Sequence, residues 1–387
     1  MDNNDMELIN RSKFPKAEIS IFPTMTALAN KHNAINLAQG FPGFGADPHL
    51  LELISAAMKE GKNQYAPLTG VVALKEMLSE QIEDRGGRCY DPIDEITITA
   101  GATQALNSVF SSIVFPGDEV IVLEPAYDCY VPSIELNGGI TVRSSLKKET
   151  YEVDWSDVKR KVNARTKAIV VNTPHNPTGT IWKQKDIEEL KNIVRNTNVI
   201  IVSDEVYEHI VFDDHKHLSI CNEPQLAERA FVIYSFGKTY HLTGWRAGYV
   251  VAPKELMSEF VKCHQSQIYS VNTPVQHALA IYGENSNVHL ELNQFFQAKR
   301  DFFLKCIKGS AFTPIVPQGT YFCLLDYSSI TKAKDVDFAR RLTIESKVAA
   351  IPISVFFKEK RQDQVLRFCF AKNNDVLEKA AERLKSI

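Results

Sequence analysis

Near the middle of the 387-residue chain stands the run FVIYSFGKTYHLTGWR, which covers residues 231–246. Its first four residues are apolar and of strand length, so Lys238 is expected where a buried strand opens into a loop. Ligands of open α/β sheets bind at the carboxyl ends of the strands. A lysine there can form an imine with an aldehyde cofactor, and Ser235 and Arg246 can bind the phosphate of that cofactor.

Two other interpretations of this run need weighing. The triplet Gly237-Lys238-Thr239 matches the end of a phosphate-binding P-loop, but that motif needs another glycine at position 232, where the chain has Val232. The other interpretation is that Lys238 is an ordinary surface lysine, and this run of sequence alone does not exclude it.

The flanking sequence, from residue 94 to residue 252, alternates short β-rich runs with helical segments. Near-continuous apolar runs, such as Val199 to Val202, are expected where helices cover both faces of a sheet. The segment is therefore predicted to be an α/β domain with a mainly parallel, doubly wound sheet. We expect strands at 95–99, 119–123, 167–172, 199–203, 231–234 and 248–251, and helices at 102–114, 130–137 and 186–196.

The C-terminal part has another rhythm. A helical stretch near residue 290 is followed by a strand at 319–325, a helix at 336–345 and a strand at 364–370, which suggests a smaller α+β unit. We expect three regions. These are an N-terminal segment that joins the small domain (1–44, with one helix near 24–31), a large domain (45–289) and a small domain (290–387).

Composition narrows the classes of function. The chain is 44% hydrophobic and 24% charged with a net charge of -3, so it offers no electrostatic reason to expect nucleic acid or a membrane as partner. No signal peptide or membrane-spanning run is evident, and we expect a cytoplasmic protein. The seven cysteines are dispersed, as is typical of reduced thiols, and no metal site is expected.

Three further strand ends carry polar residues. Asn176 follows the predicted strand 167–172, and its amide suits a phenolate oxygen. Asp204 ends an apolar strand, and a buried carboxylate needs a cationic partner, either a pyridinium nitrogen or an ordinary salt bridge. Tyr207 can point the same way from a helical turn. The turn before the helix that starts at Ala102 offers free amides and a positive dipole end to an anion.

Together these motifs resemble the class I pyridoxal-phosphate aminotransferases of the fold-type I group, from about Ile21 to the C-terminus. The methionine aminotransferase and kynurenine/glutamine aminotransferase branch is the most similar. The segments that carry this likeness are Gly40-Phe41-Pro42, Asn63 to Gly70, Asp204 to His209 and Ser354-Val355-Phe356.

The resemblance implies a role for each matching residue. Lys238 would bind pyridoxal 5'-phosphate as an imine and, once freed, move the proton between the substrate α-carbon and the cofactor. Asp204 would pair with the ring nitrogen, and Asn176 and Tyr207 with the ring oxygen. Tyr127 would stack on the ring, although an aromatic residue after a strand is otherwise more often part of the core. The phosphate would be surrounded by Gly101, Ala102, Thr103, Ser235 and Arg246, and by Tyr65 of the other subunit of a homodimer.

Substrate binding is implied by one more arginine. Arg367 stands between apolar residues, and a guanidinium can hold a carboxylate through two parallel hydrogen bonds. In the family this position binds the α-carboxylate, helped by Gly40 and Asn176, whereas a solvent-facing arginine is the alternative. Aspartate-type relatives carry a second arginine near residues 266–274, and this chain has none there. An uncharged side chain is therefore expected, held by Phe22, Phe44, Tyr65, Tyr127 and Phe356.

The resemblance predicts a ping-pong transfer of the amino group from an L-amino acid to a 2-oxo acid. Methionine, aromatic amino acids, kynurenine and glutamine all fit the expected pocket. Two alternatives stay open. One is β-elimination from a cysteine conjugate on the same cofactor. The other is a non-catalytic cofactor-binding regulator, but such regulators carry an additional DNA-binding domain, for which we expect no space in the few residues before Ile21.

Overall fold

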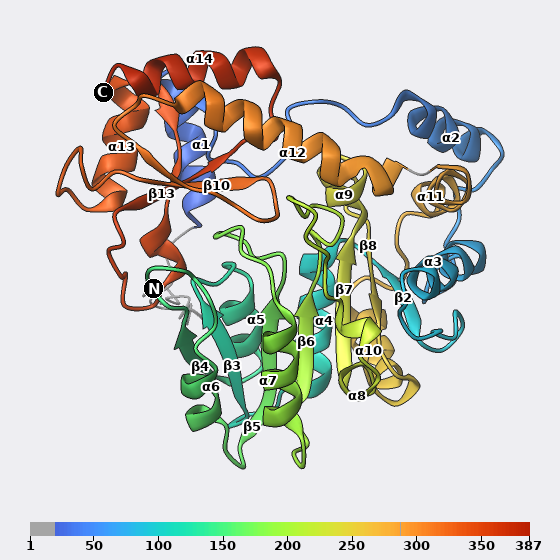
Figure 1. The fold of residues 1–387 in the computed structure, drawn as a ribbon. Helices are drawn as coiled ribbons and strands as arrows, with labels where there is room; N and C mark the ends of the chain where they lie inside the picture. Colours follow the sequence, from blue (N-terminus) through green and yellow to red (C-terminus); the bar gives the residue numbers. More distant parts are fainter. Residues whose placement is uncertain (1–19, 287) are drawn as a thin grey trace, which may run out of the picture.

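The computed structural model describes residues 20–286 and 288–387. Its largest sheet has seven strands, which run from the edge strand β2 to the edge strand β4 (Figure 1). Strands β3 to β7 are parallel to one another, whereas β8 is antiparallel to both β2 and β7. The spatial order is β2 (Ile96–Thr99), β8 (Gly248–Val251), β7 (Ala230–Ser235), β6 (Ile200–Asp204), β5 (Thr166–Asn172), β3 (Glu119–Glu124) and β4 (Ile140–Ser145).

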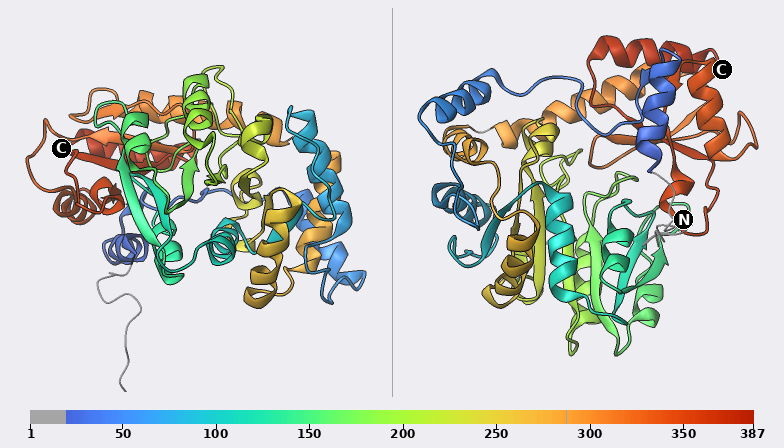
Figure 2. Two further views of the ribbon diagram at one scale, coloured as in Figure 1. Left: turned by 90° about the horizontal axis from the view of Figure 1, so that it is seen from below. Right: turned by 180° about the vertical axis from the view of Figure 1, so that it is seen from behind.

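Helices cover both faces of this sheet, as the front and back views show (Figures 1 and 2). Side chains alternate between the faces: Val120 and Val122 belong to one buried cluster, and Ile121 and Leu123 belong to the other. This alternation follows from the two-residue period of a strand. The first cluster lies under α4 (Ala102–Ile113), α5 (Tyr130–Leu136) and α10 (Lys254–Gln267), the second under α6 (Trp155–Lys161), α7 (Gln184–Val194) and α8 (Pro224–Ala227).

The predicted α/β class with a mainly parallel sheet is therefore confirmed. Each predicted strand and helix of the segment 94–252 is present, with ends that differ from the expected ones by at most two residues. The edge strand β4 was not predicted. Three helices that pack together beyond β2 were not predicted either: α2 (Pro48–Lys59), α3 (Val72–Asp84) and α11 (Thr273–Asn285).

A second, antiparallel sheet of four strands forms the C-terminal part of the molecule. Its strands in spatial order are β12 (Ile351–Pro352), β13 (Val365–Cys369), β10 (Phe322–Asp326) and β9 (Thr313–Ile315). It is accompanied by α12 (Val288–Ile307), α13 (Asp335–Glu345) and α14 (Asn374–Lys385). The long α12 runs across the top of the molecule in Figure 1, from α14 toward α9 (Phe236–Thr239) and α11.

The N-terminal segment returns to this second sheet. Helix α1 (Ile21–Lys31) packs against α13, and β1 (Ile35–Asn36) pairs in parallel with β11 (Val348–Ala349). This packing supports the expected association of residues 20–44 with the small domain, while the boundaries at 44 and 289 stay predictions. Residues 1–19 of the predicted first region lie outside the described residues. Within residues 20–286 and 288–387, no helix is long and apolar enough to cross a membrane.

Candidate active site

A cavity of 280 Å³ lies where the carboxyl ends of the large sheet face the C-terminal sheet and the segment after β1. All of the residues predicted to bind the cofactor or the substrate carboxylate line it, except Gly101 and Tyr65. The lining is Phe22, Gln39, Gly40, Phe41, Ala102, Thr103, Leu106, Tyr127, Tyr130, Asn172, Asn176, Asp204, Val206, Tyr207, Ser235, Lys238, Thr243, Arg246, Phe322 and Arg367.

Lys238 lies on the short helix α9, directly after β7. Its Nζ atom donates to the carbonyl oxygen of Gly40 at 3.4 Å and lies 5.7 Å and 5.8 Å from the ring centres of Tyr207 and Tyr321. Burial disfavours the ammonium form, so the pKa of Lys238 is lowered to about 8. A lysine poised near neutral pH can both accept and return a proton.

Asp204 is the last residue of β6, and its side chain is buried. Its Oδ2 atom accepts a hydrogen bond from the Tyr130 hydroxyl at 2.6 Å, and its Oδ1 atom accepts one from the Val206 amide at 3.3 Å. Burial raises the pKa of Asp204 to about 6, despite the opposing effects of these donors. Within the described part of the chain this carboxylate has no salt bridge, and Lys238 favours its charged form only from beyond salt-bridge distance, so a cationic ligand beside it would stabilise the charge further.

An anion seat is formed between the start of α4 and Arg246. Gly101 precedes α4 with a φ of +79°, and a Cβ at this position would lie 2.7 Å from the Arg246 Nη2 atom. A larger residue at 101 would therefore push the guanidinium away from the helix start. Ser235 and Thr103 line the same cavity. Amides at a helix start, hydroxyl groups and a guanidinium are the donors that suit a phosphate.

Arg367 lies on β13, between β10 and β12, and is only 1% exposed, which excludes a solvent-facing arginine. Its Nη1 atom donates to Asn176 Oδ1 at 2.7 Å and its Nη2 atom to the Ala38 carbonyl at 3.1 Å. The guanidinium carbon lies 4.0 Å from the centre of the Phe322 ring. No carboxylate neutralises this buried cation within the described residues, so the site suits an anionic ligand.

Four predicted residues do not line the cavity of their own chain: Gly101, Tyr65, Phe44 and Phe356. Gly101 contributes to the anion seat because its lack of a side chain leaves room for the Arg246 guanidinium. Tyr65 is 82% exposed and packs edge-on against Tyr269, with ring centres 5.4 Å apart. Phe44, expected near the substrate side chain, instead packs against His241 and the aromatic residues of α12.

Two tyrosines of the site were not predicted. Tyr130 was predicted only as the start of a helix, and its hydroxyl reaches a carboxylate 74 positions away. Tyr321 was placed in a C-terminal strand, yet its hydroxyl donates to Gly40 at 2.7 Å. The spacing of Tyr127 and Tyr130 by three residues, at the start of a helix, was the only local signal for the first of them.

The sequence also matches a known protein family. The model of the family described as aminotransferase class I and II matches residues 32–384. This chain belongs to that family. Its members depend on pyridoxal phosphate, and the chain is accordingly a pyridoxal-phosphate-dependent aminotransferase of fold type I.

Two curated relatives and one solved structure show the extent of the likeness. Methionine aminotransferase of Escherichia coli is 44% identical over 100% of both chains. Human kynurenine–oxoglutarate transaminase 1 is 32% identical over 92% of this chain and 93% of its own. The crystal structure of E. coli YbdL, described as a methionine aminotransferase, matches with a TM-score of 0.96 over 98% of this chain and 100% of its own.

The residues of the cavity fit pyridoxal phosphate. A buried carboxylate without an ion pair suits a protonated ring nitrogen, and the seat between α4 and Arg246 suits the phosphate. Lys238 lines the same cavity and supplies the amine that an aldehyde needs to form an imine, and Tyr127 and Asn176 line this cavity too. Holding the cofactor would therefore satisfy the charges that the protein alone leaves unpaired.

Proposed function

We propose that this chain transfers the α-amino group of an L-amino acid with an uncharged side chain to a 2-oxo acid, with methionine and aromatic amino acids as preferred donors. The observation that carries the proposal is that one cavity contains two charged side chains, Arg367 and Asp204, each of which suits a different ligand group. Arg367 suits the substrate carboxylate, and Asp204 suits the cofactor ring. Lys238 lies in the same cavity, as an amine that exchanges a proton near neutral pH.

Arg367 fixes the substrate. Two of its nitrogens are held by Asn176 and by the Ala38 carbonyl, while its Nε atom is buried and has no partner within the described residues. A guanidinium in this state has a hydrogen-bonding position to offer, and binding a carboxylate also removes its uncompensated charge.

The walls of the cavity favour an uncharged side chain. The cations that line it are Lys238, Arg246 and Arg367, each of which already has a role, so none is left for a second carboxylate. Phe22 and Phe322 line the cavity beside Arg367, and Phe356 lies against Phe22 with ring centres 6.1 Å apart. Burying a thioether or an aromatic ring against these side chains is favourable by roughly 25 cal/mol per Å².

Lys238 moves the proton. Pyridoxal phosphate, when bound, supplies an electron sink for the electron pair that the substrate α-carbon releases. The neutral amine of Lys238 takes the α-proton, so that a C–H bond breaks and an N–H bond forms. Lys238 would then give this proton up at a second position in the same cavity. A water molecule would supply the oxygen of the 2-oxo acid product, while the α-nitrogen would stay with the bound cofactor until a second 2-oxo acid takes it up by the reverse steps.

The proposal includes a homodimer. Tyr65 belongs to the cofactor-binding set by its resemblance to the family, yet it is exposed and outside the cavity of its own chain. Its exposure and its edge-on contact with Tyr269 support a role for Tyr65 at the cavity of a second copy. The catalytic unit would then be the dimer.

The experiment that tests the proposal is a donor comparison with the purified protein. Methionine, phenylalanine, kynurenine, glutamine and aspartate are supplied separately with a set of 2-oxo acids, and the new amino acid is measured. We expect methionine and aromatic donors to react at least tenfold faster than aspartate, because an unpaired second carboxylate is costly to bury. Faster turnover of aspartate would contradict the proposal, and so would release of pyruvate and ammonia from cysteine conjugates as the only reaction.

A further inference from the structure

The carbonyl oxygen of Gly40 joins three segments that are distant in the sequence. It accepts a hydrogen bond from the Tyr321 hydroxyl at 2.7 Å and another from the Lys238 Nζ atom at 3.4 Å. Gly40 follows β1, Lys238 follows β7, and Tyr321 directly precedes β10. A carbonyl oxygen has two lone pairs, so it can accept from both donors at once.

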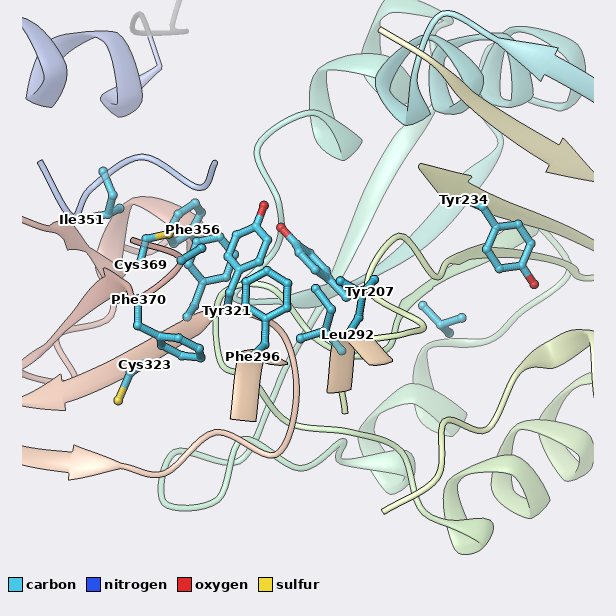
Figure 3. Packing of buried hydrophobic residues seen from close by; sticks show 14 of the residues in the cluster. Tyr207, Tyr234, Leu292, Phe296, Tyr321, Cys323, Ile351, Phe356, Cys369 and Phe370 are labelled. Carbon is cyan, nitrogen blue, oxygen red and sulfur yellow. The ribbon is translucent and has the colours of Figure 1, made fainter. Parts of the chain in front are cut away.

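Tyr321 is held rigidly enough to place its hydroxyl. The residue is completely buried, and its ring meets Tyr207 edge-on, with ring centres 5.2 Å apart and planes at 90°. Figure 3 shows the two rings side by side, with Phe296 packed below Tyr321. Buried aromatic rings in edge-to-face contact have little freedom to turn. The 2.7 Å hydrogen bond from the Tyr321 hydroxyl therefore fixes the orientation of the Gly40 carbonyl.

Gly40 has no room for a side chain. A Cβ at this position would lie 2.6 Å from the Cζ atom of Phe322. The absence of a side chain lets the backbone approach the C-terminal sheet closely enough for its carbonyl to meet Tyr321. The position of the Gly40 carbonyl, which accepts from Lys238, is thus set by packing against the C-terminal sheet.

We propose that Tyr321 is a positioning residue for the proton transfer: its hydroxyl fixes the Gly40 carbonyl as the acceptor that holds the freed amine of Lys238. This inference rests on the proposed function, because it assigns the moving proton to Lys238. The amine becomes an ammonium group each time it takes a proton. Gly40 then accepts from this ammonium group, and the rings of Tyr207 and Tyr321 face it at 5.7 Å and 5.8 Å.

Other charged or titratable groups also act on Lys238, and the test must separate them from Tyr321. Asp204 favours the ammonium form, whereas Arg246 and Arg367 disfavour it. The groups that face Lys238 come from several elements: Asp204 on β6, Tyr207 after β6, Arg246 after the turn Thr243–Trp245, Tyr321 before β10, and Arg367 and Cys369 on β13.

Replacing Tyr321 by phenylalanine removes the hydroxyl and keeps the ring. Tyr327→Phe is the matched control, because Tyr327 is also completely buried and donates its hydroxyl to a backbone carbonyl, that of Ala333, at 3.0 Å. Tyr327 does not line the cavity. Both variants lose one buried hydrogen bond of the same type, so a general loss of stability affects them equally.

Two measurements test the role. In Tyr321→Phe we expect kcat with methionine to fall about tenfold at an unchanged KM, and the isotope effect with α-deuterated methionine to rise. In the pyridoxamine-phosphate form of the holoenzyme, where Lys238 is free, acetic anhydride should label this lysine with an apparent pKa lower by about one pH unit than in the wild type. Labelling is followed by mass spectrometry of the Lys238 peptide.

The outcomes separate this inference from the proposed function. A wild-type protein that converts no amino acid would contradict the proposed function itself. Wild-type conversion together with a Tyr321→Phe variant that behaves like Tyr327→Phe in both measurements would overturn only the role of Tyr321. A labelling pKa that rises in Tyr321→Phe would overturn it too, because it would mean that the hydroxyl competes with Lys238 for the carbonyl.

Discussion

The hydroxyl of Tyr130 donates a hydrogen bond of 2.6 Å to Asp204 Oδ2, from the first turn of α5 to the end of β6. The bond favours the charged form of a carboxylate that burial otherwise drives toward the neutral form. In the proposed site, a charged Asp204 would keep the cofactor nitrogen protonated. Tyr130 would therefore contribute to cofactor binding through Asp204.

Tyr130→Phe should weaken the binding of pyridoxal phosphate about tenfold at pH 7, since a hydrogen bond to a charged group is lost. The pKa of Asp204 should rise, so the loss should be larger at pH 6 than at pH 8. Equilibrium dialysis of the cofactor at several pH values measures both effects. The control is Tyr282→Phe, which removes a similar bond of 2.8 Å to Asp47 outside the cavity and should leave cofactor affinity unchanged.

Asp204→Asn should stabilise the cofactor-free protein while it weakens cofactor binding. The pKa of Asp204 is about 6 in the folded chain against an ordinary value of 3.8, so the buried carboxylate costs stability as the pH rises through this window. The gain in the free energy of unfolding should grow between pH 4 and pH 6, be constant above pH 7, and reach about 1–3 kcal/mol. Urea unfolding without cofactor at pH 5 and pH 8 measures it. A variant less stable than the wild type at pH 8 would refute this reading of Asp204.

Arg367→Lys should reduce kcat/KM for methionine about a hundredfold, mainly through KM, because a lysine cannot form two parallel hydrogen bonds to a carboxylate. The matched control is Arg300→Lys. Arg300 is buried like Arg367, but it is paired with the carboxylate of Asp213 and lies outside the cavity. The control should lose stability and keep its KM. An equal change of KM in both variants would remove Arg367 from substrate binding.

Tyr65→Ala and Lys238→Ala should each be inactive alone and active when mixed. In a mixed dimer, the chain with Lys238 receives an intact Tyr65 from its partner, so one of the two sites is complete. Refolding the two variants together should recover about a quarter of the wild-type activity, as random pairing of two chains implies. Tyr65 acting within its own chain would give no recovery at any ratio.

The sequence predicted the parts of the fold that have strong local patterns. Buried strands such as β6 are continuous apolar runs, and the polar residues at their ends were expected in one site. Strand β4 was missed because it lies at the sheet edge, where Ile140 is exposed and polar residues interrupt the apolar pattern. The pair β1–β11 was missed because each strand has only two residues.

Long-range polar contacts could not be predicted from local patterns. The bond between Arg367 and Asn176 spans 191 positions, and that between Tyr321 and Gly40 spans 281. Nothing near either residue specifies its partner, because the partner is set by how the C-terminal sheet packs over the strand ends. The sequence therefore indicated which residues belong to the site, and the packing of the two sheets specified which of them touch.

The most direct test of the central claim is the absorbance spectrum of the purified protein loaded with pyridoxal phosphate. Addition of methionine should convert the band of the lysine-bound cofactor to that of pyridoxamine phosphate, and a 2-oxo acid should restore it. Lys238→Ala should lack the original band and show no such cycle. A wild-type band that no amino acid converts, or a Lys238→Ala variant that cycles like the wild type, would contradict the account.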